Sequence, residues 1–581
     1  MMSMLTGKGK YILTALFFAV SFWFWGVLAF GTLWFLETTQ FFPYTGSHLA
    51  AALCYPGGIS GYVSEFFVQF FHLRLCAALL VSLAFCLLQV LMWKVMVSIN
   101  GKNDALFPLS FVVAFGAWAF MCELGSMFTC VIALIVTLGT YLVYTNHVKR
   151  RQWLILPMVA LLYYGAGPVS LLFPLLMLFK ALAGKDLHLA VMAFAGGLLW
   201  ATLPAVWSMF VQYTPKELYM GIDYLSTPEE YSLTFYVLMA STAVIAFLSM
   251  LPRIHGNIVA SVIFGCLSVL VFAGGWTFVV RNCNPNLERI YEYDRLCCSR
   301  DWCGILDKAE SRPPVSLAEI SAVNLAMAKK GVLLSEMFRF LQPGPEALFP
   351  DYALGYVVAL TAGESVYHSG LLNTARHYAF EEYESYPNYN QSARHMKRLA
   401  EIDLINGNHE VARRYLKNLD KTLFYHHWAK TFLKDPEAVA SDVEYSALMQ
   451  CRDTSRYLYN DSSDDDKRLM LRRLVEKNRG SYDVPSEYLI AYDLLAKDLR
   501  SLAEDLGRVR FKNGIPAHVQ EAVCLLSKFE SDCDPAVLKL AGQETKEAFD
   551  CYQRALIDSR SPKWLKDNFG KTYWYYFSSR K

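Results

Sequence analysis

Five ionisable residues interrupt the weakly charged first half of the chain at places where chemistry is feasible. Glu37, His48 and Glu123 stand between long apolar runs, as do Arg74 and Lys216. A carboxylate or an imidazole can take a proton from a hydroxyl group. A basic side chain can stabilise negative charge on a phosphate. These residue types predict proton transfer beside an anionic group, whereas a purely solvated role is the alternative for each.

Apolar runs must position these residues. A bilayer core needs about 20 apolar residues per helix, and the first 280 residues contain nine candidate runs. They are about 11–36, 73–93, 106–121, 126–146, 153–164, 166–183, 187–212, 232–251 and 257–280. We therefore expect an all-α fold that begins with a polytopic transmembrane bundle of about nine spans over residues 1–280.

The positions of lysine and arginine predict the sidedness of this bundle. If the spans alternate, ten basic residues fall on one side: Lys8, Lys10, Lys94, Lys102, Lys149, Arg150, Arg151, Lys180, Lys185 and Arg253. The opposite loops of this half contain only Arg74 and Lys216. Because basic loops remain in the cytoplasm, we expect a cytoplasmic N-terminus. Nine spans then place the C-terminal half outside the cytoplasm.

The outward loop 37–72 is long and amphipathic. Phe66, Phe67, Phe70 and Phe71 form an apolar face, and Glu65 and Gln69 lie on another. Such a segment is expected to lie on the membrane surface rather than to cross the bilayer. Pro56-Gly57-Gly58 interrupts it and is interpreted as a structural break, because it lacks the context of a phosphate-binding loop.

The polar C-terminal half is predicted to be helical throughout. Ala375-Arg376-His377-Tyr378 recurs 37 residues later as Ala412-Arg413-Arg414-Tyr415, and Gly370 and Gly407 share that offset. Paired helices at this spacing resemble tetratricopeptide repeats. The resemblance implies a helical-repeat domain over 315–581 that binds a protein partner, with Arg376 and Arg413 as candidate contact residues. A helical cap without a partner is the alternative.

Residues 281–314 form a cysteine-containing junction between the two halves. Four cysteines lie between positions 283 and 303. If this segment is outside the cytoplasm, such a cluster can form a disulfide, and free thiols are the alternative. Their spacing lacks paired zinc-ligand motifs. Asp464, Asp465 and Asp466 lack the spacing of a calcium loop, and the aromatic segment 573–577 is expected to pack over the last helix.

Composition narrows the classes of function. The net charge of +2 gives no indication of a nucleic-acid partner. No apolar run contains a series of Asp, Glu or His of the kind that marks ion or proton pathways, which disfavours a transporter.

The layout of residues 1–280 resembles the membrane glycosyltransferases of the C-type fold. In both, a first span leads to an outward loop with membrane-parallel helices, and acidic residues occupy the first two outward loops. Glu37 and Glu123 match these acids by position, although neither stands in an Asp-Asp, Asp-x-Asp or Glu-x-Asp pair. The resemblance implies sugar transfer from a lipid-phosphate donor, with a divalent metal as an optional cofactor. The whole chain also resembles an uncharacterised bacterial multi-pass family, which implies an inner-membrane protein of the cell envelope with a periplasmic tail.

Two functions are therefore expected. In the first, Glu37 is the catalytic base with Glu123 as second acid, His48 assists, and Arg74 and Lys216 bind the leaving phosphate of a lipid-linked sugar. In the second, the chain is a non-catalytic membrane scaffold whose repeats bind an envelope protein. The residues alone do not decide whether the chain is an enzyme.

Overall fold

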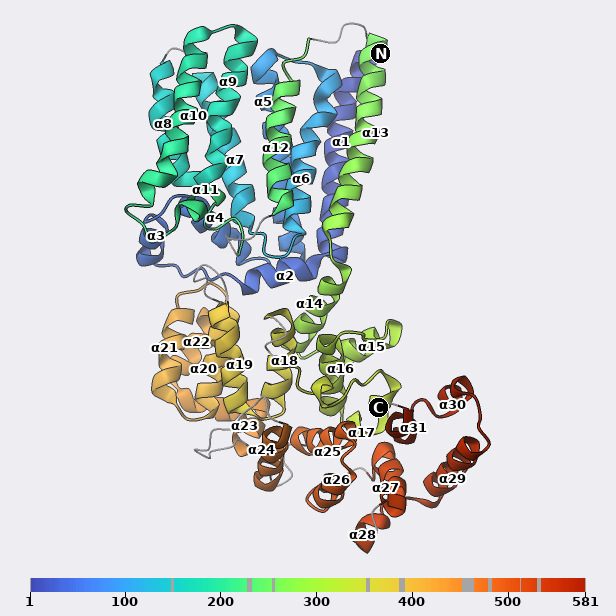
Figure 1. Ribbon diagram of the computed structural model, residues 1–581. Helices are drawn as coiled ribbons and strands as arrows, with labels where there is room; N and C mark the ends of the chain where they lie inside the picture. The colour runs from blue at the N-terminus through green and yellow to red at the C-terminus, as the bar shows by residue number, and fades with distance from the viewer. Residues whose placement is uncertain are drawn as a thin grey trace. The chain divides into compact units, whose positions relative to one another are not determined.

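The computed structural model describes residues 2–147, 151–226, 232–252, 257–351, 356–385, 392–451, 464–478, 483–512, 514–529 and 534–579. Lys149, Arg150, Arg253 and Cys533 lie outside these ranges. All regular elements of the described residues are helical, as predicted (Figure 1), and Ser126 and Leu225 form an isolated β-bridge. The chain divides into two compact units: the first holds the residues up to Glu288 and two short later segments, and the second holds most of the remainder.

The first unit contains helices suited to a membrane. Among the described residues, seven helical runs are long and apolar enough to cross a bilayer: Lys8–Leu28, Arg74–Asn100, Asp104–Met121, Phe128–His147, Gln152–Gly184, Leu187–Trp207 and Ile258–Asn282. Leu233–Leu248 is a shorter apolar helix. These runs contain α1 (Met2–Trp23), α5 (Arg74–Asn100), α6 (Phe111–Met121), α7 (Phe128–His147), α10 (Leu187–Trp207), α12 (Leu233–Leu248) and α13 (Asn257–Asn282).

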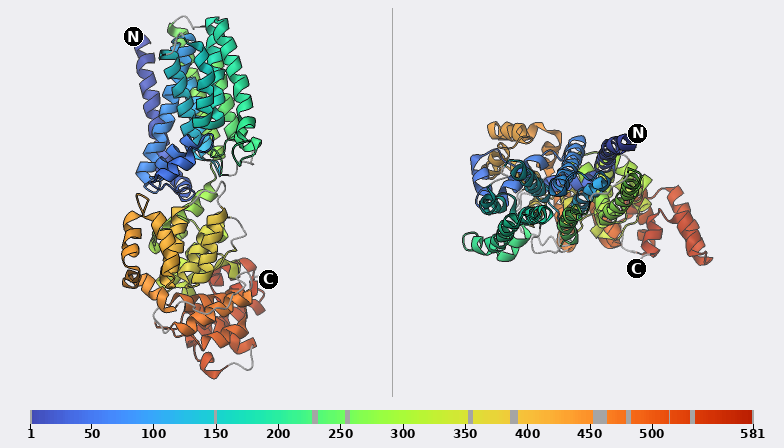
Figure 2. Two further views of the ribbon diagram at one scale, coloured as in Figure 1. Left: turned by 90° about the vertical axis from the view of Figure 1, so that its left-hand side faces the viewer. Right: turned by 90° about the horizontal axis from the view of Figure 1, so that it is seen from above.

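The run Gln152–Gly184 reverses direction within its length. It consists of α8 (Ile155–Ala166), a 3₁₀ turn over Gly167–Leu171 and α9 (Leu172–Gly184). The Gln152 side chain donates a hydrogen bond to Asp186 at 2.9 Å, so the start of the run lies beside the residue that follows its end. α8 and α9 are therefore two antiparallel helices, and Figure 2 shows the helices of this unit aligned along a common direction.

The inter-helix segments gather at two ends of this bundle. At one end, Lys10 pairs with Asp104 at 2.5 Å, and Asn100 donates to the Met250 carbonyl at 3.0 Å. At the other end, the Met127 N–H donates to the Tyr224 carbonyl at 2.9 Å. This second end carries the segment that follows the first span.

Three helices occupy that segment: α2 (Phe30–Thr38), α3 (Gly46–Ala52) and α4 (Gly58–Val68). The carboxylate of Glu288 accepts hydrogen bonds from the N–H groups of Gly31 and Thr32 and from the Thr32 hydroxyl. A carboxylate at a helix N-terminus satisfies unpaired N–H groups and the helix dipole. The residues that follow the last span are thereby fastened to α2.

The second unit is built from short helices, several of them in consecutive pairs. Its longer helices are α14 (Pro285–Cys298), α15 (Trp302–Ser311), α16 (Leu317–Lys330), α18 (Tyr356–His368), α19 (Leu372–Ser385), α20 (Ala393–Ile405), α21 (His409–Leu419), α24 (Asp464–Lys477), α25 (Val484–Ala496), α27 (Ala517–Phe529) and α29 (Gln543–Ile557). The turns of the pairs α18–α19 and α20–α21 have glycine at positive φ, +92° at Gly370 and +78° at Gly407. This left-handed conformation explains glycine at both positions.

An ion network lies in the interior of the second unit. Arg394 on α20 donates two hydrogen bonds to Asp294 at 2.7 and 2.6 Å, and Asp294 is 1% exposed. Arg398 does the same to Glu364 at 2.7 and 2.8 Å. Because buried carboxylates need such partners, the two arginines bind α20 to α14 and α18.

Local packing resolves two further expectations. Cys283, Cys297, Cys298 and Cys303 are free thiols in the structure, so the junction contains no disulfide among them.

In α31 (Tyr573–Ser579), Trp574 is buried and its indole N–H donates to the Glu521 carbonyl at 2.7 Å. The C-terminal aromatic segment was expected to pack over the last helix; it instead forms the last described helix itself, and its Trp574 ring contacts Phe549 and Tyr552 on α29.

Replacing Arg394 by methionine should destabilise the second unit by about 3–5 kcal/mol, because Asp294 would remain buried without its partner. Chemical unfolding followed by tryptophan fluorescence measures this change. The exposed Arg414→Met is the control and should change stability by less than about 0.5 kcal/mol. Adding Asp294→Asn to Arg394→Met should recover part of the loss; a double variant as unstable as the sum of both single variants would contradict the pairing.

Candidate active site

An imidazole–carboxylate pair lies in the first outward segment of the membrane unit. His48 on α3 and Glu65 on α4 approach to 2.7 Å between Nε2 and Oε2, and each side chain keeps 22% of its surface exposed. Thr45 caps α3 by accepting a hydrogen bond from the His48 N–H at 3.3 Å. The rings of Phe42 and Tyr62 lie 5.4 Å from the imidazole. The pair is thus held in an aromatic surrounding and remains accessible.

A second carboxyl group, from a distant part of the chain, reaches the turn between α3 and α4. The Tyr55 hydroxyl donates to Oδ2 of Asp223 at 2.8 Å, and the ring of Tyr213 lies 5.8 Å from that of Tyr55. Asp223 is half-buried. It follows α11 (Pro215–Met220) in the loop that leads to α12.

Glycines at the start of α4 permit this approach. Gly57 has a φ of +89°, and its N–H donates to the Tyr164 carbonyl at 2.8 Å. A Cβ on Gly58 would lie 2.1 Å from the Ala52 carbonyl oxygen, and a Cβ on Gly61 would lie 2.8 Å from Oδ2 of Asp223. Any larger residue at position 61 would displace the carboxyl group, so this glycine sets the distance between α4 and Asp223.

Hydrogen bonds to backbone carbonyl groups fix the loop that carries Asp223. Tyr224 is buried, and its hydroxyl donates to the Ala166 carbonyl. The Tyr163 hydroxyl donates to the Leu218 carbonyl at 3.1 Å, and the Ser226 N–H donates to the Gly125 carbonyl at 2.6 Å. The Asp223 side chain is therefore presented by a rigid turn.

The electrostatics of the two carboxyl groups are coupled. Burial raises the pKa of Asp223 to about 7, against an opposing hydrogen bond from Tyr55, and the charge on Glu65 raises it further. Burial also raises the pKa of Glu65, an effect that its hydrogen bond to His48 partly offsets. Burial and the charge of Asp223 raise the pKa of Tyr55. The charge on Glu65 disfavours ionisation of Asp223, so the two carboxyl groups lie within electrostatic reach of each other.

This arrangement provides a proton donor and a proton acceptor within electrostatic reach of each other. A carboxyl group that keeps its proton near neutral pH can donate a hydrogen bond, and a carboxylate beside a histidine can accept a proton. Within the described residues, no group of three or more His, Cys, Asp or Glu side chains is placed to hold a metal ion.

The predicted acids Glu37 and Glu123 have other surroundings. Glu37 lies in the last turn of α2 and is 9% exposed. The Glu123 carboxylate accepts hydrogen bonds from Ser232, at 2.7 Å, and from Thr234. Ser232 is the N-cap of α12, so Glu123 fastens the α6–α7 loop to the start of that helix.

The predicted phosphate-binding residues lie in different segments. Arg74 begins α5, and its guanidinium group lies 5.3 Å from the ring centre of Phe30. Lys216 lies in α11, within the loop that carries Tyr213 and Asp223, and is exposed. Lys216 therefore shares a segment with Asp223.

The predicted partner-binding arginines lie on the helical pairs of the second unit. Arg376 lies on α19, and its guanidinium nitrogen is 3.4 Å from the fully buried Asp403. Arg413 lies on α21 and is exposed. Both expectations about a partner remain predictions.

Sequence reasoning placed His48 at the site but missed Glu65, Asp223 and Tyr55 as functional candidates. Glu65 is the only acid in α4, a helix otherwise made of apolar and small residues, and that isolation was a usable signal. Asp223 gave no such signal, because the partner that buries it is 168 positions away in the chain.

Substituting Asp223 by asparagine should change how stability depends on pH. Between pH 3.8 and about 7, the carboxyl group ionises in the unfolded chain but keeps its proton in the folded one, so wild-type stability falls as pH rises through this window. Asparagine still accepts the Tyr55 hydrogen bond but cannot ionise. The melting temperature of Asp223→Asn, measured by differential scanning fluorimetry in detergent, should therefore fall less steeply, with a gain of several degrees at neutral pH. An unchanged slope would contradict the raised pKa.

The chain was also compared with known proteins. No curated protein and no solved structure matches it. A family model, that of the family of unknown function DUF6057, matches residues 7–580. Because the match spans nearly the whole chain, from the first span to the last helix, the protein belongs to the DUF6057 family.

Proposed function

We propose that this protein is a membrane-embedded transferase that moves a sugar from a lipid-phosphate carrier to a hydroxyl acceptor. The coupled carboxyl groups of Glu65 and Asp223 carry this proposal, because they supply an acid and a base at one end of a bundle of apolar helices. Sugar chemistry commonly uses two carboxyl groups in these roles. The rings of Tyr55 and Tyr213 add aromatic surface beside the acid.

Glu65 is the base in the proposed reaction. It takes the proton of the acceptor hydroxyl, whose oxygen forms a bond to the anomeric carbon of the sugar. The bond from that carbon to the phosphate oxygen breaks, and the lipid phosphate leaves with the electron pair. His48 orients the Glu65 carboxylate through the 2.7 Å contact, and the raised pKa of Glu65 makes it a stronger base near neutral pH.

Asp223 assists the departure of the phosphate. In its protonated form it donates a hydrogen bond to a phosphate oxygen, which stabilises negative charge as it develops. Its pKa of about 7 keeps a large fraction protonated at neutral pH. Lys216 supplies positive charge from the same loop.

The assignment is tested with purified full-length protein in liposomes that contain polyprenyl-phosphate-linked hexose, hexosamine or pentose, with a mixture of cell-envelope glycans added as the hydroxyl acceptor. Release of free polyprenyl phosphate is followed by mass spectrometry. Glu65→Gln should lower the rate by roughly 10²–10⁴-fold, the usual contribution of a general base. Activity should rise with pH as Glu65 ionises and fall as Asp223 loses its proton at about pH 7. Asp223→Asn keeps a hydrogen-bond donor and should remove the alkaline decline.

Two variants control this test. Glu217→Gln replaces an acid in the same loop and retains its N-terminal capping box, so activity should persist. Glu37→Gln distinguishes the two candidate bases. Full activity in Glu65→Gln together with loss in Glu37→Gln would overturn the assignment of Glu65, and absence of release by the wild-type protein with every donor would overturn the function.

We further propose that the first unit crosses the membrane nine times, with α8, α9 and α12 as three of the crossings. The antiparallel course of α8 and α9 supports this count, although each has fewer residues than a typical span. The basic residues then favour a cytoplasmic N-terminus and an extracytoplasmic second unit of an inner-membrane protein.

Cysteine labelling tests this orientation. Cys303 and Cys551 are exposed and should react with a membrane-impermeant maleimide in intact spheroplasts, as detected by peptide mass spectrometry. Lys102→Cys, at a side chain that is 69% exposed, should react only after permeabilisation. The reverse pattern would contradict the proposed sidedness.

We further propose that the second unit has an additional role, which is to bind a protein partner. The pairs α18–α19 and α20–α21 repeat one turn geometry, with glycine at positive φ in each, and stacked helix pairs commonly bind peptides or proteins. We propose a tetratricopeptide-like solenoid there, with the exposed Arg413 on its surface. A wild-type protein that releases no polyprenyl phosphate would leave this scaffold role as the better-supported function.

A further inference from the structure

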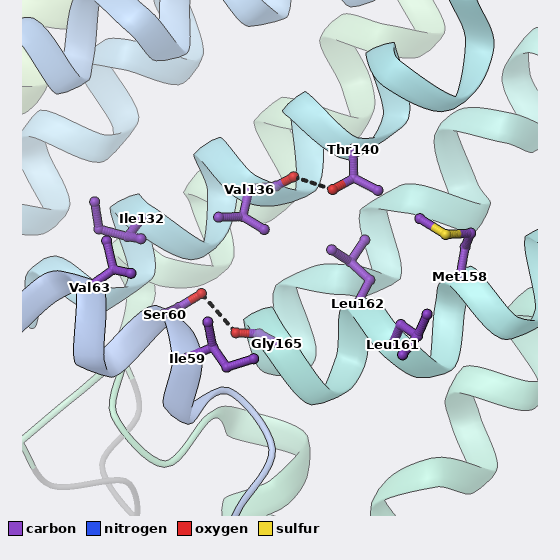
Figure 3. Close-up of a pocket in the computed structure, with 10 residues that line it drawn as sticks. All are labelled: Ile59, Ser60, Val63, Ile132, Val136, Thr140, Met158, Leu161, Leu162 and Gly165. Atoms are coloured by element: carbon purple, nitrogen blue, oxygen red, sulfur yellow. Dashed lines mark hydrogen bonds between the residues drawn. The ribbon is translucent and has the colours of Figure 1, made fainter. Parts of the chain in front are cut away.

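An apolar pocket lies beside the candidate active site, between α4, α7 and α8 (Figure 3). Its volume is about 260 Å³. Ten residues line it: Ile59, Ser60, Val63, Ile132, Val136, Thr140, Met158, Leu161, Leu162 and Gly165. None of these side chains is charged, and most of the lining consists of hydrocarbon groups.

The two hydroxyl groups of the lining form hydrogen bonds within the protein. Ser60 donates to the Gly165 carbonyl at 3.0 Å, and Thr140 donates to the Val136 carbonyl at 2.8 Å. Figure 3 shows both bonds and the apolar side chains around them. A polar ligand would find no available partner in these hydroxyl donors, whereas a hydrocarbon chain requires none.

The position of the pocket provides access to lipid. α7 and α8 belong to runs long and apolar enough to cross a bilayer. Several lining side chains are exposed at their surface, including Ile59 at 39%, Val136 at 39% and Leu161 at 65%. In a membrane such a surface faces the hydrocarbon of lipid chains.

The pocket adjoins the carboxyl pair through α4. Ser60 lines the pocket, and the next residue, Gly61, lies against Oδ2 of Asp223. Successive residues of a helix are separated by about 100° around its axis. The apolar lining and the acid therefore occupy adjoining faces of one helix.

We propose that this pocket holds the first part of the hydrocarbon chain of the lipid-phosphate substrate, and so places its phosphate and sugar at Glu65 and Asp223. This inference rests on the proposed function for the identity of the lipid. In this proposal, the isoprenoid chain of the lipid contacts α4, α7 and α8.

The test uses the full-length protein in nanodiscs and a polyprenyl phosphate that carries a diazirine near its phosphate end. On illumination, peptides of α4, α7 and α8 should be labelled, and excess unlabelled polyprenyl phosphate should lower this labelling at least tenfold. A phosphatidylcholine with the diazirine at the same depth is the comparison. Equal labelling by both probes without competition would indicate ordinary bilayer contact and would overturn the proposal.

A substitution that fills the pocket can be paired with a control substitution at a glycine outside the pocket. A Cβ on Gly165 would meet only Ile59, at 3.8 Å, and a Cβ on Gly197 of α10 would meet nothing within 4 Å. Gly165→Leu should therefore fold and lower the competed labelling about tenfold, whereas Gly197→Leu should not change it. Val136→Trp, at an exposed position on α7, is a second filling variant in case Gly165→Leu is unstable.

The outcomes separate this inference from the proposed function. Competed labelling that Gly165→Leu and Val136→Trp remove supports the pocket even where no sugar is transferred. Wild-type rates and KM for the lipid donor in both folded filling variants would overturn the pocket and leave the transferase intact.

Discussion

The close contact between Gly61 and Asp223 is the constraint on which the first unit depends. With a hydrogen atom in place of a side chain, α4 lies directly against the carboxyl group, and a Cβ there would be only 2.8 Å from its oxygen. The Tyr55 hydroxyl donates to the same carboxyl group, and the charge of Glu65 on α4 affects its ionisation. The raised pKa values, the acid–base pairing and the position of the apolar pocket all follow from where α4 lies.

Arginine neutralises two buried carboxyl groups of the second unit: Arg394 pairs with Asp294, and Arg398 pairs with Glu364, whose pKa is held well below its usual range although burial opposes this. Two other carboxyl groups of that unit, Glu487 and Asp493, have pKa values that burial raises to about 8. A raised pKa by itself therefore does not distinguish Asp223 from them. Asp223 differs because Glu65, which pairs with the accessible His48, acts on its charge. An ion pair holds its charges in place, whereas a carboxyl group with a raised pKa can exchange its proton near neutral pH.

The sequence predicted the elements better than the contacts between them. Apolar runs and glycine spacing predicted the helices, including the pairs on either side of Gly370 and Gly407, because these signals are local. Asp223 was missed because its burial comes from Tyr55 and Gly61, which are distant in the chain. Glu123 was predicted as a second acid from its place in an outward loop, but no sequence pattern indicates that Ser232 and Thr234 would bind its carboxylate. The position of an acid in an outward loop, as for Glu123, was therefore a weaker indication of a candidate site than the isolation of an acid in an apolar helix, as for Glu65.

The geometry of α4 links recognition of a lipid to the proposed reaction. Ser60 and Val63 line the pocket, and Gly61 and Glu65 belong to the carboxyl site. A rigid helix carries both sets, and the bond from the Gly57 N–H to the Tyr164 carbonyl ties its start to α8. A hydrocarbon chain in the pocket would also exclude water from the neighbouring face of α4, and burial is the main cause of the raised pKa values of Asp223 and Glu65. Occupation of the pocket would therefore strengthen the same electrostatic condition that the proposed acid and base require, so substrate binding and activation of the site would be one event.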